Sequence, residues 1–332
     1  MEIKLKNIED VINNMFIGQA LLVSHSIGLF EALKSNPKFE ELQHTLLIER
    51  RPLQALLSIC LSVGLAEFIN GRYCLSKEAE MNLTPGNDNY YSDIFNLYIH
   101  NHDIFNFTTL KKAILEDKPQ VYDGKDVFEE NKNNYALTKT FISSMHNKSR
   151  NSAKKFAQYI NCEEHKIFLD IGGGSGIYTI NLCKRYKNVE GIIFDMPIVC
   201  KIAQEFIEQE NLTSSIKTNK GDLWEDTFPN ADIHFYSDIF HDWSYDKCML
   251  LIKKSYKSLP KGGQIIINEK LFNDEKTGPL SAAIYNLKML LWTEGQQYTY
   301  KEILNMLKKV GFKNVLVKNY FKDWSIITAL KN

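Results

Sequence analysis

The stretch Ile167-Phe168-Leu169-Asp170-Ile171-Gly172-Gly173-Gly174-Ser175-Gly176 decides the fold of the C-terminal half of the chain. A short apolar run ends in an acid, and a cluster of glycines follows it. This pattern predicts a buried strand, a tight turn and then a helix over Ile177–Tyr186. Glycine is needed where a ligand approaches the main chain, because any Cβ would block the approach.

The spacing of the glycines excludes the common nucleotide-binding loops. A dinucleotide fingerprint needs Gly-x-Gly-x-x-Gly, and the third glycine would fall at Ile177 or Thr179. The Gly-Lys-Ser/Thr of a phosphate-binding loop is absent from this turn. An acid before the turn repels a pyrophosphate and suits a ligand with positive charge, such as S-adenosylmethionine (SAM). A purely structural strand-to-helix turn is the alternative.

Four more short segments after the turn are predicted strands that alternate with helices. The predicted strands are Gly191–Asp195, Ser215–Lys220, Asp232–Ser237 and Gly262–Glu269, and helical patterns cover Pro197–Glu210 and Tyr245–Ser258. This alternation is typical of a doubly wound, mostly parallel α/β sheet. Ligands bind at the carboxyl ends of such strands. The polar residues expected at those ends are Asp170, Asp195, Asp222, His241 and Glu269.

These motifs together resemble the SAM-dependent O-methyltransferases of the caffeate/hydroxyindole (acetylserotonin) type, in a bacterial-like form. The residues that carry the resemblance are Asp170–Gly176, Phe194-Asp195-Met196-Pro197, Gly221-Asp222-Leu223-Trp224, His241-Asp242-Trp243, Pro260–Gly263 and Asn268-Glu269, with Phe141, Met145 and Ser149 in an upstream helix. The resemblance extends over essentially the whole chain, and the order and spacing of the motifs make it specific.

The resemblance implies a Rossmann-like class I methyltransferase domain with a seven-stranded sheet. It also implies an N-terminal helical, winged-helix-like dimerisation domain and therefore a homodimer. The expected division is a dimerisation domain over residues 1–115, connecting helices that line the active site over 116–160, and the SAM-binding domain over 161–332. SAM is the expected cofactor, S-adenosylhomocysteine its product, and secondary metabolism the expected setting.

Residue roles carried over from the family place two groups in catalysis. His241 is the expected general base, since a histidine can take a hydroxyl proton near neutral pH, and Glu269 is expected to orient it. The expected cofactor-binding residues are Ser149, Asp170, Gly172, Gly174, Gly176, Asp195, Met196, Asp222, Leu223 and Ser237. The expected substrate-pocket residues are Phe141, Met145, Trp292 and Gln297.

Two departures from the plant members bear on the chemistry. Ser237 stands where those members have a lysine, and Gln297 stands where they have a second glutamate, for which Glu294 is a candidate substitute. The expected reaction is methylation of a phenol or enol hydroxyl on a small, largely apolar, aromatic or polyketide-like molecule. C- or N-methylation and SAM-dependent decarboxylation or cyclisation remain alternatives on the same fold.

The N-terminal half has helical patterns at Ile8–Phe16, Ala20–Leu33 and Leu53–Val63, followed by a predicted hairpin over Leu65–Leu75. A long helical segment is expected over Ser92–Leu115. A winged helix that grips DNA needs basic residues on its recognition helix. Leu53–Val63 has none, so a SAM-sensing DNA-binding regulator is the weaker alternative.

Composition agrees with a small-molecule enzyme. Lys+Arg and Asp+Glu each number 40 in 332 residues, so no net charge favours nucleic acid or an anionic membrane. The six cysteines form no Cys-x-x-Cys pair, and the charged start, Met1–Asp10, lacks the apolar run of a signal peptide. We therefore expect a cytoplasmic protein with reduced thiols, no metal site, no membrane span and no nucleic-acid partner.

Overall fold

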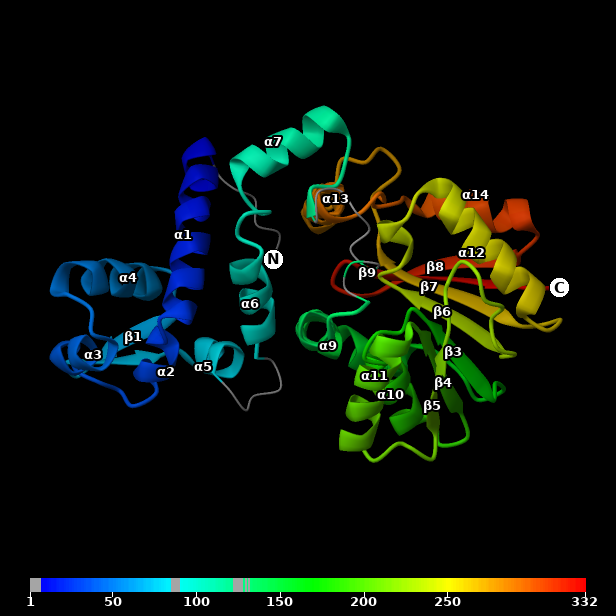
Figure 1. The fold of residues 1–332 in the computed structure, drawn as a ribbon, viewed down its shortest axis with the longest axis horizontal. Helices are drawn as coiled ribbons and strands as arrows, with labels where there is room; N and C mark the ends of the chain where they lie inside the picture. Colours follow the sequence, from blue (N-terminus) through cyan, green and yellow to red (C-terminus); the bar gives the residue numbers. More distant parts are fainter. Residues whose placement is uncertain (1–6, 85–89, 122–127, 129, 131) are drawn as a thin grey trace. The chain divides into compact units, whose positions relative to one another are not determined.

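The computed structural model describes residues 7–84, 90–121, 128, 130 and 132–332. The chain divides into two compact units, Met1–His102 and Asp103–Asn332, which are described separately (Figure 1). The three-part division predicted from the sequence remains a prediction, and residues 122–127, 129 and 131 of its connecting segment lie outside the described residues.

The first unit begins with one long helix, where the sequence predicted two. Helix α1 runs over Ile8–Ser26 and α2 over Leu29–Leu33, so the predicted break after Phe16 is wrong. Gly18 does not interrupt α1, because a single glycine weakens a helix without ending it. The break comes at Gly28, whose φ of 79° is left-handed.

The rest of the first unit is a helix pair followed by a hairpin. Its elements are α3 (Phe39–Leu46), α4 (Arg50–Ser62), the antiparallel strands β1 (Ala66–Ile69) and β2 (Arg72–Leu75), α5 (Lys77–Leu83) and α6 (Ser92–His100). The predicted hairpin is confirmed. Helix α4 starts at Arg50 and not at Leu53, so its first turn carries two arginines. The Arg50 guanidinium lies 4.9 Å from the Phe39 ring centre, against the unit's own surface.

The second unit is built on a seven-stranded sheet of order β5-β4-β3-β6-β7-β9-β8. The strands are β3 (Ile167–Ile171), β4 (Glu190–Asp195), β5 (Ile216–Lys220), β6 (Ile233–Ser237), β7 (Gln264–Lys270), β8 (Lys313–Phe321) and β9 (Trp324–Leu330). The first five are parallel, and β9 runs antiparallel to both of its neighbours. This confirms the predicted doubly wound, mostly parallel sheet.

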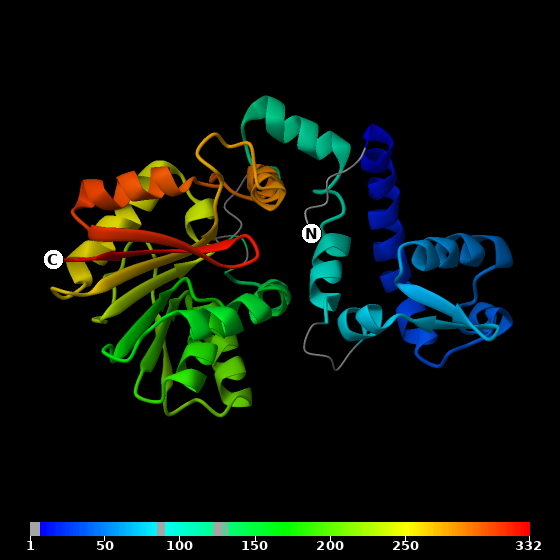
Figure 2. The same ribbon diagram turned by 180° about the vertical axis from the view of Figure 1, so that it is seen from behind.

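Helices cover both faces of this sheet (Figures 1 and 2). Helices α9 (Tyr135–Tyr159), α10 (Ile177–Arg185) and α11 (Pro197–Gln209) lie on one face, and α12 (Tyr245–Ser258) and α14 (Tyr300–Val310) lie on the other. Phe156 and Phe168 pack in the core of the first face, and Leu251 and Ile267 in that of the second. Because the first five strands are parallel, their carboxyl ends lie along one edge of the sheet, which we call the rim.

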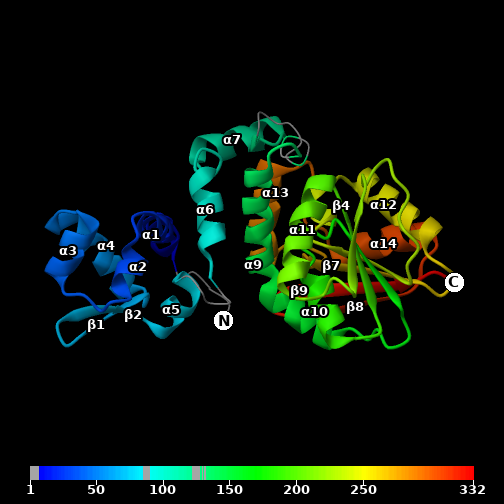
Figure 3. The ribbon, with the colours of Figure 1, turned by 60° about the horizontal axis from the view of Figure 1, so that its bottom comes forward.

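The second unit also contains α7 (Phe107–Glu116) and α13 (Leu280–Trp292). The predicted single helix over Ser92–Leu115 is wrong, because the chain restarts at Asn106, whose side chain accepts the Thr109 N–H at 2.9 Å. Figure 3 shows α9 and α11 on one side of the sheet and α12 and α14 on the other. Within the described residues, no helix combines the length and the apolar character that a membrane crossing requires.

Candidate active site

The glycines of the turn after β3 have different surroundings: Gly172 and Gly176 are closely packed, whereas Gly174 borders open space. A Cβ on Gly172 would lie 2.5 Å from Ile239 Cδ1, and one on Gly176 would lie 2.1 Å from Ile193 Cδ1. A Cβ on Gly174 would meet only Ile142 Cδ1, at 3.7 Å, although its φ of 57° is left-handed. The backbone at Gly174 is therefore the part of the turn that a ligand can approach.

Two buried carboxylates stabilise this turn and the start of the helix that follows it. Asp195 Oδ2 accepts the Gly174 N–H at 2.9 Å, and its other oxygen accepts the Met196 N–H at 2.8 Å. Asp170 Oδ2 accepts the Thr179 hydroxyl at 2.6 Å. Burial raises the pKa of Asp195 to about 6 and that of Asp170 to about 7. A cationic ligand at the turn would favour the charged form of both, which fits the sulfonium and ammonium of SAM.

The predicted adenine loop after β5 is shaped by its own hydrogen bonds. Asp222 Oδ1 accepts the Trp224 N–H at 2.6 Å, and Lys254 Nζ donates to the carbonyls of Leu223 and Trp224. Nearer the middle of the sheet, the Ser237 hydroxyl accepts from Asn268 Nδ2 at 2.9 Å. The buried Ser149 lies on α9, where its carbonyl accepts the hydroxyl of Ser152.

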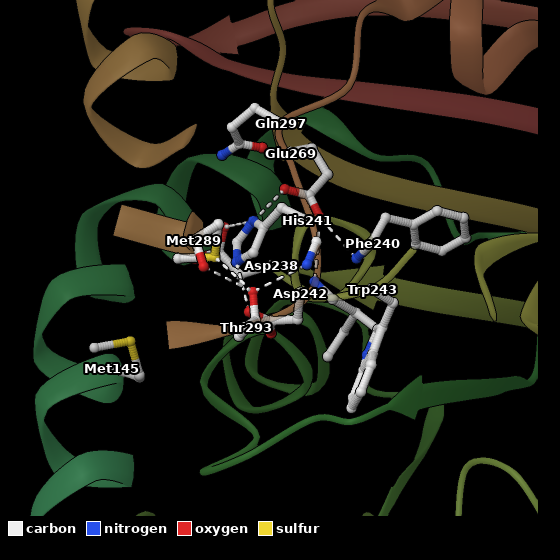
Figure 4. Close-up of polar contacts among 12 residues, drawn as sticks. Met145, Asp238, Phe240, His241, Asp242, Trp243, Glu269, Met289, Thr293 and Gln297 are labelled. Atoms are coloured by element: carbon white, nitrogen blue, oxygen red, sulfur yellow. Dashed lines mark hydrogen bonds and ion pairs between the residues drawn. The ribbon is translucent and has the colours of Figure 1, made fainter. Parts of the chain in front are cut away.

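His241 and Glu269 form a buried pair at the rim (Figure 4). His241 lies in a short 3-10 helix, Phe240–Asp242, after β6, and Glu269 lies near the end of β7. His241 Nδ1 donates to Glu269 Oε2 at 2.8 Å. Glu269 Oε1 also accepts the N–H groups of Ile239 and Phe240 at 3.1 and 3.0 Å. Glu269 therefore fixes both the orientation of the His241 ring and the loop that carries it.

The electrostatics of this pair include a third residue that the sequence analysis did not assign. Asp242 Oδ1 lies 3.6 Å from His241 Nε2, the nitrogen that Glu269 leaves free. Burial alone lowers the pKa of His241, but the charges of Glu269 and Asp242 outweigh it and raise the pKa to about 10. Burial raises the pKa of Asp242 to about 7, against the opposing effect of His241. The two groups therefore titrate as a coupled pair.

Lys148 and Asp238 extend the cluster toward α9. Lys148 Nζ lies 2.9 Å from Asp238 Oδ2. Burial opposes the charge of Asp238, but Lys148 and His241 outweigh burial and lower its pKa. Ligating atoms of Asp238, His241 and Glu269 lie within 4.8 Å of one another, as in a metal site. Lys148 already supplies a counter-charge to Asp238, and Glu269 is engaged by two backbone N–H groups, so these carboxylates are not free for a metal ion.

The predicted pocket residues have different surroundings. Figure 4 shows Gln297 beside Glu269. Its side-chain nitrogen is buried and has no hydrogen-bond partner among the described residues. Met145 is half-buried on α9, whereas Phe141 packs in the small core between α9 and α11. The Trp292 ring lies 5.9 Å from that of Phe105.

Glu294, the candidate substitute for the missing glutamate, points away from His241. Its carboxylate accepts the Ser244 N–H at 3.3 Å and pairs with Lys247 at 3.1 Å. Next to it, a Cβ on Gly295 would lie 2.1 Å from the carbonyl oxygen of His241. The loop over 293–297 therefore supports the backbone of the histidine loop. Besides Glu269, the acidic groups near His241 are Asp242 and Asp238.

His146 is a residue of the glycine turn's surroundings that the sequence analysis missed. Its Nδ1 lies 2.9 Å from the Ser175 hydroxyl, and its ring stacks on Phe206 at 4.2 Å. Burial lowers its pKa to about 4, so it is neutral at neutral pH. The sequence feature that could have indicated His146 is its position directly after Met145, in the helix that carries Phe141, Met145 and Ser149.

Comparison with known proteins places this site in a described family. A family model for the O-methyltransferase domain matches residues 107–313. A 3-hydroxy-5-methyl-1-naphthoate 3-O-methyltransferase from Streptomyces sahachiroi is 29% identical over 311 residues, covering 92% of this chain and 89% of that protein. The acetylserotonin O-methyltransferase of Gallus gallus is 32% identical over 162 residues, which are 49% of this chain and 46% of that protein.

The fold is shared with a solved human enzyme. The crystal structure of human N-acetylserotonin methyltransferase in complex with SAM matches with a TM-score of 0.88 at 22% identity, covering 98% of this chain and 96% of that chain. At this level of identity, the match shows the fold.

Proposed function

Because the chain belongs to the O-methyltransferase domain family, we propose that it transfers a methyl group from SAM to a hydroxyl of a small aromatic molecule. The chain is accordingly a SAM-dependent O-methyltransferase. The observation that carries the proposal is the His241–Glu269 pair at the rim, with Nε2 left free toward Asp242. The loop that holds this pair packs through Ile239 against Gly172 of the glycine turn.

The residues of the cluster divide the proton transfer between them. SAM, when bound, supplies an activated methyl group, and an acceptor oxygen attacks it far better as an anion. With a pKa of about 10, His241 is the doubly protonated imidazolium at neutral pH. Asp242, with a pKa of about 7, is therefore the residue of the pair that can accept the hydroxyl proton. We therefore propose that His241 and Asp242 take the hydroxyl proton as one unit and that the imidazolium stabilises the oxyanion.

The acceptor is proposed to be aromatic. The rim is bordered by Met145 on α9 and by Met289 and Tyr285 on α13, and the Tyr285 ring lies 6.2 Å from the His241 ring. Apolar and aromatic side chains beside a proton-accepting pair suit a phenol or an enol. The Streptomyces and chicken relatives are both named for hydroxylated bicyclic aromatic compounds, which is the class we propose here.

The assay that tests the function uses methyl-labelled SAM and a panel of phenols, hydroxynaphthalenes, enols and aromatic amines. We expect label in an O-methyl product, identified by mass, with release of S-adenosylhomocysteine. Label found only on carbon or nitrogen would move the assignment to C- or N-methylation. Consumption of an acceptor without transfer of label would move it to SAM-dependent decarboxylation or cyclisation.

We further propose that the protein is a homodimer. One face of α1 presents apolar side chains at helical spacing to solvent, with Ile8, Met15 and Phe16 exposed by 80%, 61% and 63%. Val11 and Ile12 lie on the same face. Such a surface is costly to leave uncovered, and the resemblance identified in the sequence makes a second copy the proposed partner.

The expected solution mass at micromolar concentration is therefore about twice that of one chain. Replacing Met15 and Phe16 together by Glu should halve the mass measured by light scattering, because two charges would have to be buried in the interface. Leu47→Glu, at an exposed apolar residue in the turn after α3, is the control and should leave the mass unchanged. A monomeric wild type would contradict the proposal.

A cytoplasmic location is proposed on the state of the cysteines. All six are free thiols, and five of them are buried. Free, unpaired cysteines in this number are typical of a reducing compartment.

A further inference from the structure

Three lysine ammonium groups gather around the ring of Tyr285 at the rim. Lys270 Nζ lies 3.9 Å from the ring centre, Lys148 Nζ 4.6 Å and Lys288 Nζ 5.7 Å. They come from the end of β7, from α9 and from α13. A tyrosine ring attracts a cation only weakly, so the other partners of each lysine decide how far its charge is neutralised.

The three lysines are not equally neutralised. Lys148 is paired with Asp238, and this ion pair overcomes burial and raises the pKa of Lys148. Lys270 has no carboxylate within ion-pair distance among the described residues; its ammonium lies between the rings of Tyr285 and Trp324, 5.1 Å from the latter. In the part of the chain that the structure describes, the half-buried ammonium of Lys270 therefore has no carboxylate paired with it.

The surroundings of Lys270 disfavour its charge. Burial, followed by the charge of Lys148, lowers the pKa of Lys270 to about 8, and Lys288 acts in the same direction. Asp238 and Asp323 act against this but do not compensate. A bound anion would reverse the balance, because an opposite charge within a few ångströms favours the protonated amine. The same anion would gain from the neighbouring Lys148.

Lys270 is also placed for the acceptor and away from the methionine end of SAM. The Tyr285 ring lies 6.2 Å from the His241 ring. Lys270 Nζ lies 3.9 Å from the centre of the same Tyr285 ring. A bicyclic aromatic acid is long enough to place its hydroxyl at His241 and its carboxylate at Lys270. Strand β7 is two strands away from β3 and its glycine turn, about 10 Å across the sheet.

We infer that Lys270, together with Lys148 and Tyr285, forms a subsite for a carboxylate carried by the methyl acceptor. The inference rests on the proposed function and names its substrate class: aromatic hydroxy acids, whose hydroxyl meets the His241–Asp242 pair while the carboxylate meets Lys270. An acceptor without the acid group lacks this ionic contact and binds more weakly.

The test measures binding without turnover, in the presence of S-adenosylhomocysteine, with two probes that differ only in the acid group: a hydroxynaphthoate and the corresponding naphthol. Wild-type protein should bind the acid more tightly. Lys270→Met should weaken binding of the acid by about tenfold to a hundredfold, the worth of one charge-assisted contact. Binding of the naphthol should change by no more than about twofold, and Lys270→Arg should restore most of the affinity for the acid.

Lys318→Met is the matched control, since the Lys318 ammonium lies 4.9 Å from the Tyr159 ring, another lysine–tyrosine contact on the sheet. It should leave both affinities unchanged. Equal binding of the two probes by the wild type, including no detectable binding of either, would overturn the subsite. Equal weakening of both probes by Lys270→Met would also overturn it, as would a loss confined to S-adenosylhomocysteine. Because no turnover is required, failure of the methylation assay remains a separate result.

Discussion

His241→Ala is expected to lower turnover by about a hundredfold to ten-thousandfold, the usual contribution of a positioned acid–base group, while SAM affinity changes little. The side chain lies in the loop after β6, and the glycine turn, Asp195 and the loop after Asp222 belong to β3, β4 and β5. The measurement is kcat with any acceptor found in the panel, together with the dissociation constant for SAM from calorimetry.

The pH profile separates this role from a merely structural one. In the wild type, activity should rise with pH around 7, because Asp242 must be deprotonated to accept a proton. The imidazolium of His241 lowers the pKa of Asp242. Its removal in His241→Ala should therefore shift the remaining activity limb to higher pH. Full activity in His241→Ala, or an unshifted limb, would contradict proton acceptance by the pair.

Two Glu→Gln variants give a matched comparison for the same cluster. Glu269→Gln removes the charge that contributes most to raising the pKa of His241 and the carboxylate that accepts its Nδ1 proton. The imidazolium that stabilises the oxyanion is then disfavoured, so the loss should approach that of His241→Ala. Glu294→Gln removes the carboxylate that pairs with the surface residue Lys247. Such a pair contributes little, and activity should remain within about twofold.

The fold could be predicted from the sequence where the pattern of apolar residues reflects which side chains are buried. The runs that became β3, β4 and β7 are apolar because both faces of the sheet are covered, and the predicted strand ends differ from the observed ones by two residues or fewer. Strand β8 was not located, because it is an edge strand with mostly exposed side chains and a mixed sequence. Strand β9 was not located either, although its side chains are mostly buried. The long α1 was missed because Gly18 has open space around it and only a propensity cost.

The candidate site shows a different limit of sequence patterns. The spacing of the motifs identified the pair that the structure brings to 2.8 Å, His241 and Glu269. The groups that set its chemistry lay beyond such patterns, because their effect depends on burial and on partners far away in sequence. Asp242 acquires its raised pKa only in the fold, and Lys148 reaches Asp238 across 90 residues. Glu294, close in sequence to Gln297, turned out to face Lys247.

Gly174→Val is expected to weaken SAM binding by at least about a hundredfold, because branched carbons would occupy the open space that the ligand needs next to the Gly174 backbone. A smaller variant, Gly174→Ala, should already weaken binding. Its left-handed φ adds a conformational cost of about 1–2 kcal/mol, which lowers the melting temperature but does not itself block a ligand. The measurement is the SAM dissociation constant, together with the melting temperature with and without SAM.

Gly176→Ala is the matched control that separates ligand space from backbone strain, because Gly176 has a similar left-handed φ of 74°. Its Cβ would collide with the buried Ile193 inside the protein. The cost should therefore appear mainly as lost stability, with the SAM-induced rise in melting temperature largely kept. Gly174→Ala should show the opposite: a modest loss of stability and little or no rise with SAM. If both variants kept the rise, or both lost it to the same degree, the turn would have no distinct ligand-facing position, and the assignment of Gly174 to SAM binding would be wrong.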